Sequence, residues 1–263
     1  MNINMLLKDG KKKALTFSYD DGKISDIKLA GLLDKYKLKG TFNINSRRLQ
    51  KENFADEKNK EIMTVLQVKN LFENFSHEIA CHGLSHADLE CLRYSDVLSE
   101  ILQNRNQLEQ ISGRIVRGMA YPFCLRSDEV MNAARSAGIL YARTSDSSGY
   151  FNIPDNFLKF NPTCSHNDSN LMKLAEIFVN RQPSWGSCWL FSVWGHSNEF
   201  EVKNNWDLIE KFAGYVCCKD DIWYVTNIEF FEYIKAFHML ESTLDNHIVR
   251  NVCSTTLWFE ANG

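Results

Sequence analysis

The sequence predicts an α/β fold in which one parallel sheet closes into a barrel. Seven short apolar runs, typical of buried strands, alternate with segments whose apolar residues recur at helical spacing. Such alternation indicates a parallel sheet, either doubly wound or closed into a barrel. Polar residues of ligand-binding types follow the first, third, fourth and sixth runs. A barrel brings the carboxyl ends of all its strands to one mouth, and this favours the barrel.

The expected elements follow one another without a repeat or a low-complexity linker. A capping box from Thr64 to Gln67 opens one helix, Ser127 caps another, and Gly113 ends the helix between them. The expected strands are residues 13–18, 41–45, 76–81, 115–120, 139–143, 189–194 and 222–226. The expected helices are residues 24–36, 64–75, 95–112, 127–137, 170–180, 205–215 and 228–240.

Three stretches fall outside this alternation. Residues 50–61 are polar and expected to form an exposed loop, and residues 145–169 are expected to be irregular. Two strand-like runs, 248–253 and 256–260, come after the last helix. We therefore predict a barrel over residues 1–240 and a short β extension over residues 241–263 that packs on it.

Composition and charge argue against several classes of protein. The net charge is −3 without a basic block, which makes nucleic acid an improbable partner. No apolar run approaches the ~20 residues of a membrane span. The eight cysteines are scattered without a CxxC motif, which favours reduced thiols over disulfides. The N-terminal apolar segment is too short for a secretory signal, so we expect a cytoplasmic protein. A secreted or cell-envelope location would require a signal removed beforehand.

Two carboxylates, Asp20 and Asp21, end the first apolar run, and Gly22 permits a sharp turn after them. Adjacent carboxylates repel each other, so one must be neutralised, hydrogen-bonded or bound to a cation. A simple Asx-type turn at a strand end is the alternative for this pair taken alone.

Two histidines, His82 and His86, follow the third strand. They share one face if the segment turns helically after the strand. Two imidazoles and one carboxylate are a common ligand set for zinc or a similar divalent ion. A surface pair is the alternative for an isolated HxxxH, but the aspartates at another strand end favour a metal site.

Two further strand ends supply candidates. His196 follows a buried strand and Gly195, and facing a metal site it becomes a candidate general acid, with a structural histidine as the alternative. Arg117, near the fourth strand end, is placed to pair with a catalytic carboxylate and lower its pKa, or is a surface charge. Tyr121 and Phe123 offer aromatic surface and backbone N–H groups at the rim, or pack in the core.

These motifs, in this order, resemble the polysaccharide deacetylase family, carbohydrate esterase family four, from about residue 13 to residue 233. Thr16-Phe-Ser-Tyr-Asp-Asp-Gly22 is similar to the first motif of the family and Lys39-Gly-Thr-Phe-Asn43 to its second strand. His82-Gly-Leu-Ser-His86 is similar to its metal motif, and Val193-Trp-Gly-His196 to the strand that ends in its catalytic histidine.

The resemblance implies a distorted seven-stranded (β/α) barrel that removes acetyl groups, N-acetyl first, from a sugar or polysaccharide. It implies a divalent ion, zinc before others, and an acetylated carbohydrate as substrate. The implied metal ligands are Asp21, His82 and His86, with Asp20 as base and His196 as acid. The implied substrate and oxyanion residues are Arg117, Tyr121, Phe123 and Trp194, of which Tyr121 and Trp194 would stack against a sugar ring.

The sequence also departs from the family. The third motif usually reads Arg-Pro-Pro-Tyr-Gly, and here residues 119–124 read Met-Ala-Tyr-Pro-Phe-Cys. The arginine would fall on Ala120, so Arg117 is our substitute. The fourth motif, which tunes the acid histidine, has no clear counterpart. Two alternatives therefore stay open: a hydrolase of small non-peptide amides, and a silent carbohydrate-binding homologue. The order and spacing of the ligands disfavour an iron oxygenase.

Overall fold

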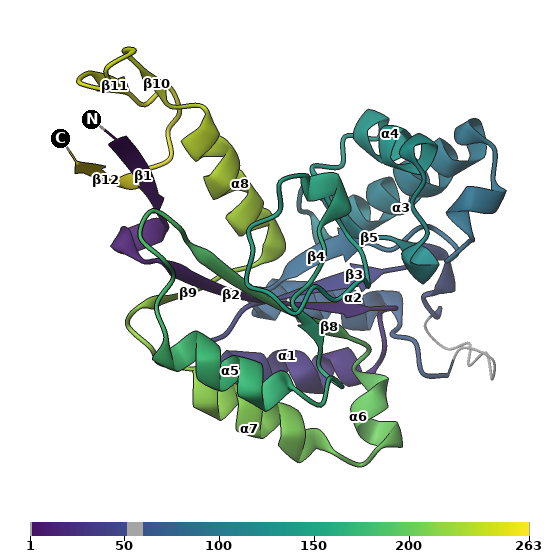
Figure 1. Cartoon of the computed structure of the whole chain (residues 1–263). Coiled ribbons are helices and arrows are strands. Elements are labelled where there is room, and N and C mark those ends of the chain that lie inside the picture. The colour runs from purple at the N-terminus through teal and green to yellow at the C-terminus, as the bar shows by residue number, and fades with distance from the viewer. Residues whose placement is uncertain (1, 52–59, 263) are drawn as a thin grey trace.

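A parallel sheet curls through the middle of the molecule (Figure 1). The computed structural model describes residues 2–51 and 60–262. The strands of this sheet are β2 (Lys13–Asp20), β3 (Gly40–Ile44), β4 (Glu78–Cys81), β5 (Gly118–Ala120), β6 (Tyr141–Arg143), β7 (Cys164–Ser165), β8 (Trp189–Gly195) and β9 (Ile222–Tyr224). Seven of them follow the order β6-β5-β4-β3-β2-β8-β7, and β9 also pairs with β2. All of these ladders are parallel.

The two ends of this curled sheet meet through loop backbone. A parallel bridge joins Arg143, at the end of β6, to Phe160 in the segment that precedes β7. The backbone N–H of Phe160 donates to Ala142, and that of Thr144 donates to Phe160. The closure is therefore irregular. The predicted distorted (β/α) barrel is confirmed, and its carboxyl ends form one mouth.

Helices cover the outside of the sheet (Figure 1). They are α1 (Ser25–Lys35), α2 (Val65–Asn74), α3 (Tyr94–Ser112), α4 (Asp128–Ser136), α5 (Leu171–Asn180), α6 (Asn198–Val202), α7 (Trp206–Val216) and α8 (Asn227–His238). α1, α5 and α7 lie together on one side of the molecule, and α3 and α4 lie together on another. α6 contacts α1 next to the mouth.

Local sequence explains where these elements begin and end. β2 is buried along its whole length because it lies in the middle of the sheet, with neighbours on both sides. The predicted capping box of Thr64 and Gln67 opens α2, and the Ser127 hydroxyl accepts from the N–H of Val130 at the start of α4. Gly113 ends α3 in a left-handed conformation, as predicted.

Other boundaries differ from the prediction. The fourth and fifth strands begin later than expected, at Gly118 and Tyr141. The stretch 145–169, expected to be irregular, contains the short strand β7. Of the predicted loop 50–61, residues 52–59 lie outside the described residues.

Both ends of the chain form antiparallel strands. β1 (Asn2–Leu6), which was not predicted, pairs with β12 (Trp258–Asn262), so the two ends of the chain lie side by side (Figure 1). β10 (Glu241–Ser242) and β11 (Val249–Arg250) form a small hairpin. Trp258 stacks on Tyr233 of α8 with ring centroids 6.4 Å apart. The boundary that we place at residue 240 stays a prediction.

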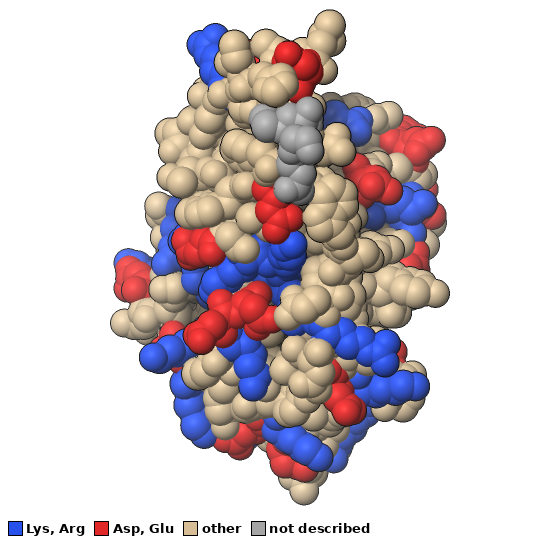
Figure 2. All heavy atoms as spheres, turned by 60° about the vertical axis from the view of Figure 1, so that its left-hand side comes forward, with Lys and Arg blue, Asp and Glu red and all other residues tan. Residues whose placement is uncertain are grey.

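Charges of both signs lie next to each other on the face shown in Figure 2. Ion pairs of the chain include Lys12–Glu260 at 2.8 Å and Lys39–Glu229 at 2.5 Å. All eight cysteines are free thiols. Within the described residues, we find no helix with the length and apolar character needed to cross a membrane.

Candidate metal centre and active site

The sharp turn after β2 separates two adjacent carboxylates. Asp21 and Gly22 are both left-handed, with φ of 80° and 66°. A Cβ at Gly22 would lie only 3.1 Å from Cγ2 of Ile44. This position therefore favours glycine both because of its left-handed backbone and because a side chain would be crowded. As a result, Asp20 is buried in a network of hydrogen bonds, whereas Asp21 faces two imidazoles.

Asp21, His82 and His86 come together at the mouth of the barrel. Oδ1 of Asp21 lies 3.7 Å from Nε2 of His82 and 3.5 Å from Nε2 of His86. One ligand atom from each of the three residues lies within 4.8 Å of the other two. A nitrogen–nitrogen–oxygen set of this kind suits zinc or a similar divalent ion.

The surroundings of the triad fit a cation. Nδ1 of His82 lies 2.9 Å from the carbonyl of Ala120, which places the ring proton on Nδ1 and leaves Nε2 as a free ligand. Burial, together with the neighbouring His82, lowers the pKa of His86 to about 4, so this ligand is neutral at pH 7. Oδ1 of Asp21 is buried without a hydrogen-bond partner, and a bound cation would satisfy it.

Two basic side chains also approach Asp21. Nζ of Lys23 lies 3.5 Å from Oδ2, and Nη1 of Arg48 lies 3.7 Å from Oδ1. Burial alone would raise the pKa of Asp21, but His82, Lys23 and the other nearby imidazoles lower it below its ordinary value. The carboxylate is therefore ionised, as a metal ligand must be.

The histidines converge for a different reason than predicted. We expected a helical turn after β4, but residues 82–88 form no helix. Gly83 and His86 instead adopt left-handed conformations, with φ of 72° and 62°. The N–H of His82 donates to Oδ1 of Asn104 in α3, which fixes the start of this loop. Two backbone reversals therefore turn both rings toward Asp21.

Arg143 holds Asp20. Asp20 is 3% exposed, and its two carboxylate oxygens accept from Nη2 of Arg143. Nδ2 of Asn43 donates to Oδ1 of Asp20 at 2.9 Å. Burial would raise the pKa of Asp20, but the Arg143 guanidinium and, less strongly, His82 and His196 lower it. The carboxylate is ionised at neutral pH.

The prediction that Arg117 pairs with the catalytic carboxylate is wrong. Nε of Arg117 donates to the carbonyl of Gly138 at 2.6 Å, because Arg117 precedes β5 and lies away from its carboxyl end. Arg143 ends β6 and points its guanidinium at Asp20 instead. The available signal was an arginine at the carboxyl end of a predicted buried strand.

His196 lies just past the end of β8. The negative charges of Asp20 and Asp21 act on its imidazole. Burial alone would lower the pKa of His196, but the nearby carboxylate of Glu199 and the two aspartates raise it above its ordinary value. Nδ1 of His196 lies 3.8 Å from Oε1 of Glu199, which sequence reasoning missed. A raised pKa suits a histidine that donates a proton.

Trp194 contacts both Arg143, the partner of the base, and His196, the candidate acid. Its ring covers the guanidinium of Arg143 at 5.0 Å and meets the ring of His196 edge-on at 6.0 Å. Nε1 of Trp194 donates to Oγ of Ser147 at 3.3 Å. The indole is partly exposed at the mouth, and its stacking against a sugar stays a prediction.

The rim beyond β5 uses its two aromatic residues differently. Tyr121 is 3% exposed, its hydroxyl donates to Leu158, and its N–H donates to Arg143. Tyr121 is therefore wrong both as a stacking platform and as an oxyanion donor, because its ring is buried and its N–H is used. Phe123 is 62% exposed and left-handed, and its ring lies 4.5 Å from that of His86. Its N–H remains the candidate oxyanion donor.

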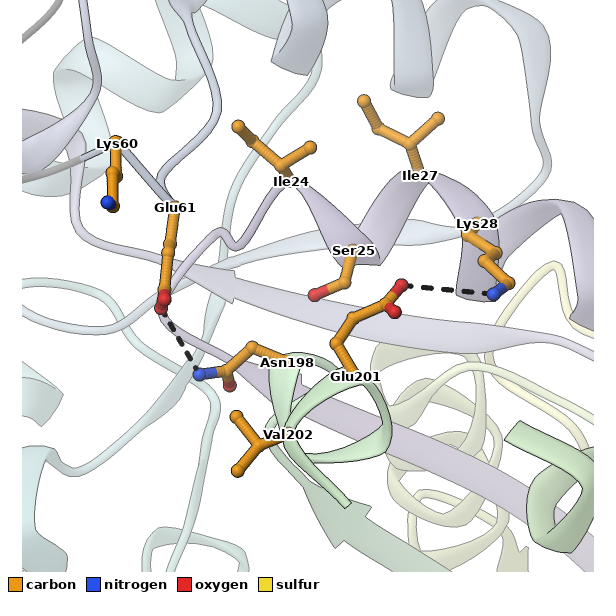
Figure 3. A pocket seen from close by; sticks show the side chains of 9 residues that line it. All are labelled: Ile24, Ser25, Ile27, Lys28, Lys60, Glu61, Asn198, Glu201 and Val202. Atoms are coloured by element: carbon orange, nitrogen blue, oxygen red, sulfur yellow. Dashed lines mark hydrogen bonds and ion pairs between the residues drawn. The ribbon is translucent and has the colours of Figure 1, made fainter. Parts of the chain in front are cut away.

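A cavity of about 500 Å³ lies between the start of α1 and α6 (Figure 3). Its apolar wall comes from Ile24 and Ile27 at the start of α1 and from Val202 at the end of α6. Asn198 and Glu61 bond across it at 3.5 Å. The five residues of the metal triad, base and acid are not among its lining residues, so the reacting position is not inside it.

The profile of the family described as polysaccharide deacetylase matches residues 7–142, more than half of the chain. The chain belongs to the polysaccharide deacetylase family. The match spans the first three ligand-bearing strand ends, from β2 to β5. A search of curated proteins found no match.

Solved structures share the fold of this family member. A protein from Mycobacterium smegmatis, assigned to the polysaccharide deacetylases, is 18% identical with a TM-score of 0.61, and the match covers 92% of this chain and 96% of that one. A family 4 acetyl xylan esterase from Clostridium thermocellum, in complex with cobalt, is 15% identical with a TM-score of 0.52, covering 84% and 91%.

A third structure, BA3943 from Bacillus anthracis, is described as a family pseudoenzyme. It is 14% identical with a TM-score of 0.53, and the match covers 84% of this chain and 66% of that one. The chain spans less than two thirds of other matched structures, such as 61% of the Streptococcus pyogenes deacetylase PplD and 44% of a polysaccharide deacetylase from Bacillus cereus.

Proposed function

We propose that this family member is a metal-dependent hydrolase that removes acetyl groups, N-acetyl first, from a sugar or polysaccharide. The observation that carries the proposal is the convergence of Asp21, His82 and His86 beside a buried, ionised Asp20 and a raised-pKa His196. The cobalt bound to the acetyl xylan esterase supports a divalent ion in this fold, and we propose zinc.

Asp21, His82 and His86 would hold the ion. When bound, such an ion supplies Lewis acidity that makes a water molecule acidic near neutral pH and polarises the acetyl carbonyl. Asp20 takes the proton from the attacking water. Arg143 keeps the base ionised and fixes its position, since Nη2 donates to both of its oxygens.

The leaving group needs a proton because an amine anion is a poor leaving group. His196 supplies this proton from the end of β8, the strand that pairs with β2 and its Asp20. The N–H of Phe123 is the proposed donor to the oxyanion, and one such donor is typically worth about 3–4 kcal/mol of transition-state stabilisation.

Acetate release from an N-acetylated chitooligosaccharide tests the proposal. Asp20→Asn should abolish release while the protein keeps its zinc, because Asp21 and the histidines hold the ion. Asp34→Asn, an exposed aspartate of α1, is the matched control and should act as wild type. Chelation should stop release, and added zinc should restore it. Full activity of Asp20→Asn would refute the assignment of the base.

Two alternatives give different results in the same assay. A hydrolase of small amides would release acetate from simple acetamides faster than from the oligosaccharide. A silent homologue would release none from either, as the pseudoenzyme description of the Bacillus anthracis structure illustrates for that protein. Retention of all five residues of the triad, base and acid supports the active alternative.

A further inference from the structure

One carboxylate, Glu199 of α6, lies between two imidazoles. Oε2 of Glu199 is 3.1 Å from Nε2 of His166, and Oε1 is 3.8 Å from Nδ1 of His196. Asn167 adds a third contact, because its Nδ2 donates to Oε2 at 2.7 Å. His196 is partly exposed at the mouth, whereas His166 is completely buried behind it. The carboxylate thus joins an interior histidine to the proposed acid.

The fold is built closely around His166. Its backbone N–H donates to the carbonyl of Trp194 at 2.8 Å, which continues the ladder between β7 and β8. Its ring stacks on Tyr19, with centroids 5.6 Å apart and planes 10° apart, and meets Phe200 at 4.2 Å. A Cβ on Gly195 would lie 2.0 Å from Nδ1 of His166, so only glycine leaves room for this ring.

Among the residues that the structure describes, the ring of His166 has one ion-pair neighbour, the carboxylate of Glu199. Its Nε2 reaches the carboxylate of Glu199, and neither ring nitrogen has a hydrogen-bond partner among the described residues. A fully buried imidazole caged by aromatic rings cannot change its orientation without repacking the core. The imidazole of His166 can therefore hold the carboxylate of the half-exposed Glu199 in one position.

We propose that His166 and Glu199 are positioning residues for His196: His166 fixes the carboxylate, which holds Nδ1 of His196 and leaves Nε2 for the leaving group. This proposal rests on the proposed role of His196 as acid. The contacts with His166 and His196 hold the pKa of Glu199 well below its usual range, so the carboxylate stays ionised between the two rings.

Other charges also act on His196. Asp20, at the end of β2, and the adjacent Asp21 also raise the pKa of His196 through their negative charge. Arg143 is paired with Asp20 and covered by Trp194. Loss of Glu199 would therefore remove the positioning contact of His196 and lower its pKa, while the two aspartates keep part of the bias toward protonation.

Two substrates with different leaving groups distinguish a positioning role of Glu199 and His166 from a merely structural one. The amine that leaves an N-acetyl sugar must be protonated, whereas the phenolate that leaves 4-nitrophenyl acetate needs no proton. We expect Glu199→Gln and His166→Leu to lower kcat on an N-acetylated chitooligosaccharide by about 10–100-fold, the loss typical when a residue that orients a metal ligand is removed, which we take as the scale for orienting the acid. Hydrolysis of the activated ester should stay close to wild type.

Two variants complete the kinetic comparison. His166→Gln should recover part of the lost kcat, because its amide nitrogen reaches toward the carboxylate as Nε2 does. Glu201→Gln is the matched control, since Glu201 lies on the same helix and pairs with Lys28 at 3.8 Å instead. Equal losses on the amide and the ester, or wild-type kcat on the amide in both Glu199→Gln and His166→Leu, would overturn the proposal.

A measurement without turnover keeps the two proposals distinguishable. In ¹⁵N-histidine NMR titrations of the whole protein, Glu199→Gln and His166→Leu should both lower the pKa of His196, and Glu201→Gln should not. This result would support the positioning pair even if the wild type released no acetate, an outcome that would reject only the proposed function. An unchanged pKa of His196 in both variants would reject the positioning pair.

Discussion

Replacement of Arg143 by glutamine tests how the barrel keeps a buried carboxylate ionised. Arg143 is 1% exposed, donates from Nη2 to both oxygens of Asp20, and is anchored by Ser18 and Thr144. The variant would leave Asp20 in the interior with Asn43 as its remaining side-chain donor. Removing one partner of a buried ion pair costs about 3–5 kcal/mol, and we expect that loss in the free energy of unfolding.

The same change should alter the pH dependence of activity. Without the guanidinium, burial raises the pKa of Asp20, and loss of one close opposite charge typically moves a carboxyl by about 1–3 pH units. The base would then stay protonated, and inactive, up to a higher pH than in the wild type. The acidic limb of the profile of kcat/KM against pH, measured by acetate release, should therefore shift to higher pH in Arg143→Gln.

A double-mutant cycle shows whether the lost stability comes from the unpaired charge. Urea unfolding of the metal-free proteins would compare Arg143→Gln, Asp20→Asn and the double variant. The double variant has no buried charge, so it should recover most of the loss seen in Arg143→Gln. Arg117→Gln is the control, and should lose only about 1 kcal/mol with its bond to Gly138. Equal losses in both arginine variants, or no recovery in the double variant, would refute the reasoning.

Three other predictions concern the cation, the barrel floor and the cage around the interior histidine. We expect the wild type to keep zinc through dialysis and His82→Ala to lose it, as elemental analysis would show, and retained zinc would contradict the ligand set. Burial raises the pKa of Glu78 to about 7, so between pH 4.5 and 7 the folded protein keeps a proton that the unfolded chain releases. The free energy of unfolding should therefore fall by about 3 kcal/mol as the pH rises over this range. In Glu78→Gln, urea unfolding should not show this decline. Gly195→Ala should lose at least about 1–3 kcal/mol, because its Cβ meets His166, whereas Gly214→Ala, whose Cβ would be 3.5 Å from its nearest neighbour, should lose less in thermal unfolding.

Sequence patterns located the strand ends better than the side chains that meet there. The alternation of apolar runs with helical spacing was enough to predict a parallel barrel, because buried parallel strands are apolar throughout. Ligand types at several strand ends then placed Asp21, His82 and His86 in one mouth, where the structure brings them together. This inference works because parallel strands present all their carboxyl ends on one side.

The partners of the base and acid were beyond the same reasoning. Arg143 reaches Asp20 from β6, which is four strands away from β2 in the sheet order, so no local spacing links the two. Glu199 belongs to a short helix after β8, and His166 to the end of β7. Their contacts depend on the irregular closure of the barrel between β6 and β7, which a pattern of seven regular strands does not contain.

The charges at the mouth explain why two adjacent aspartates can both stay ionised. Asp20 has the guanidinium of Arg143, and the left-handed turn at Asp21 points the second carboxylate toward a different set of positive or cation-binding groups. Lys23 and Arg48 approach Asp21 only at 3.5 Å and 3.7 Å, too far for short hydrogen bonds. The proposed divalent ion would fill this place, so the same backbone reversal that separates the carboxylates also divides their roles between base and ligand.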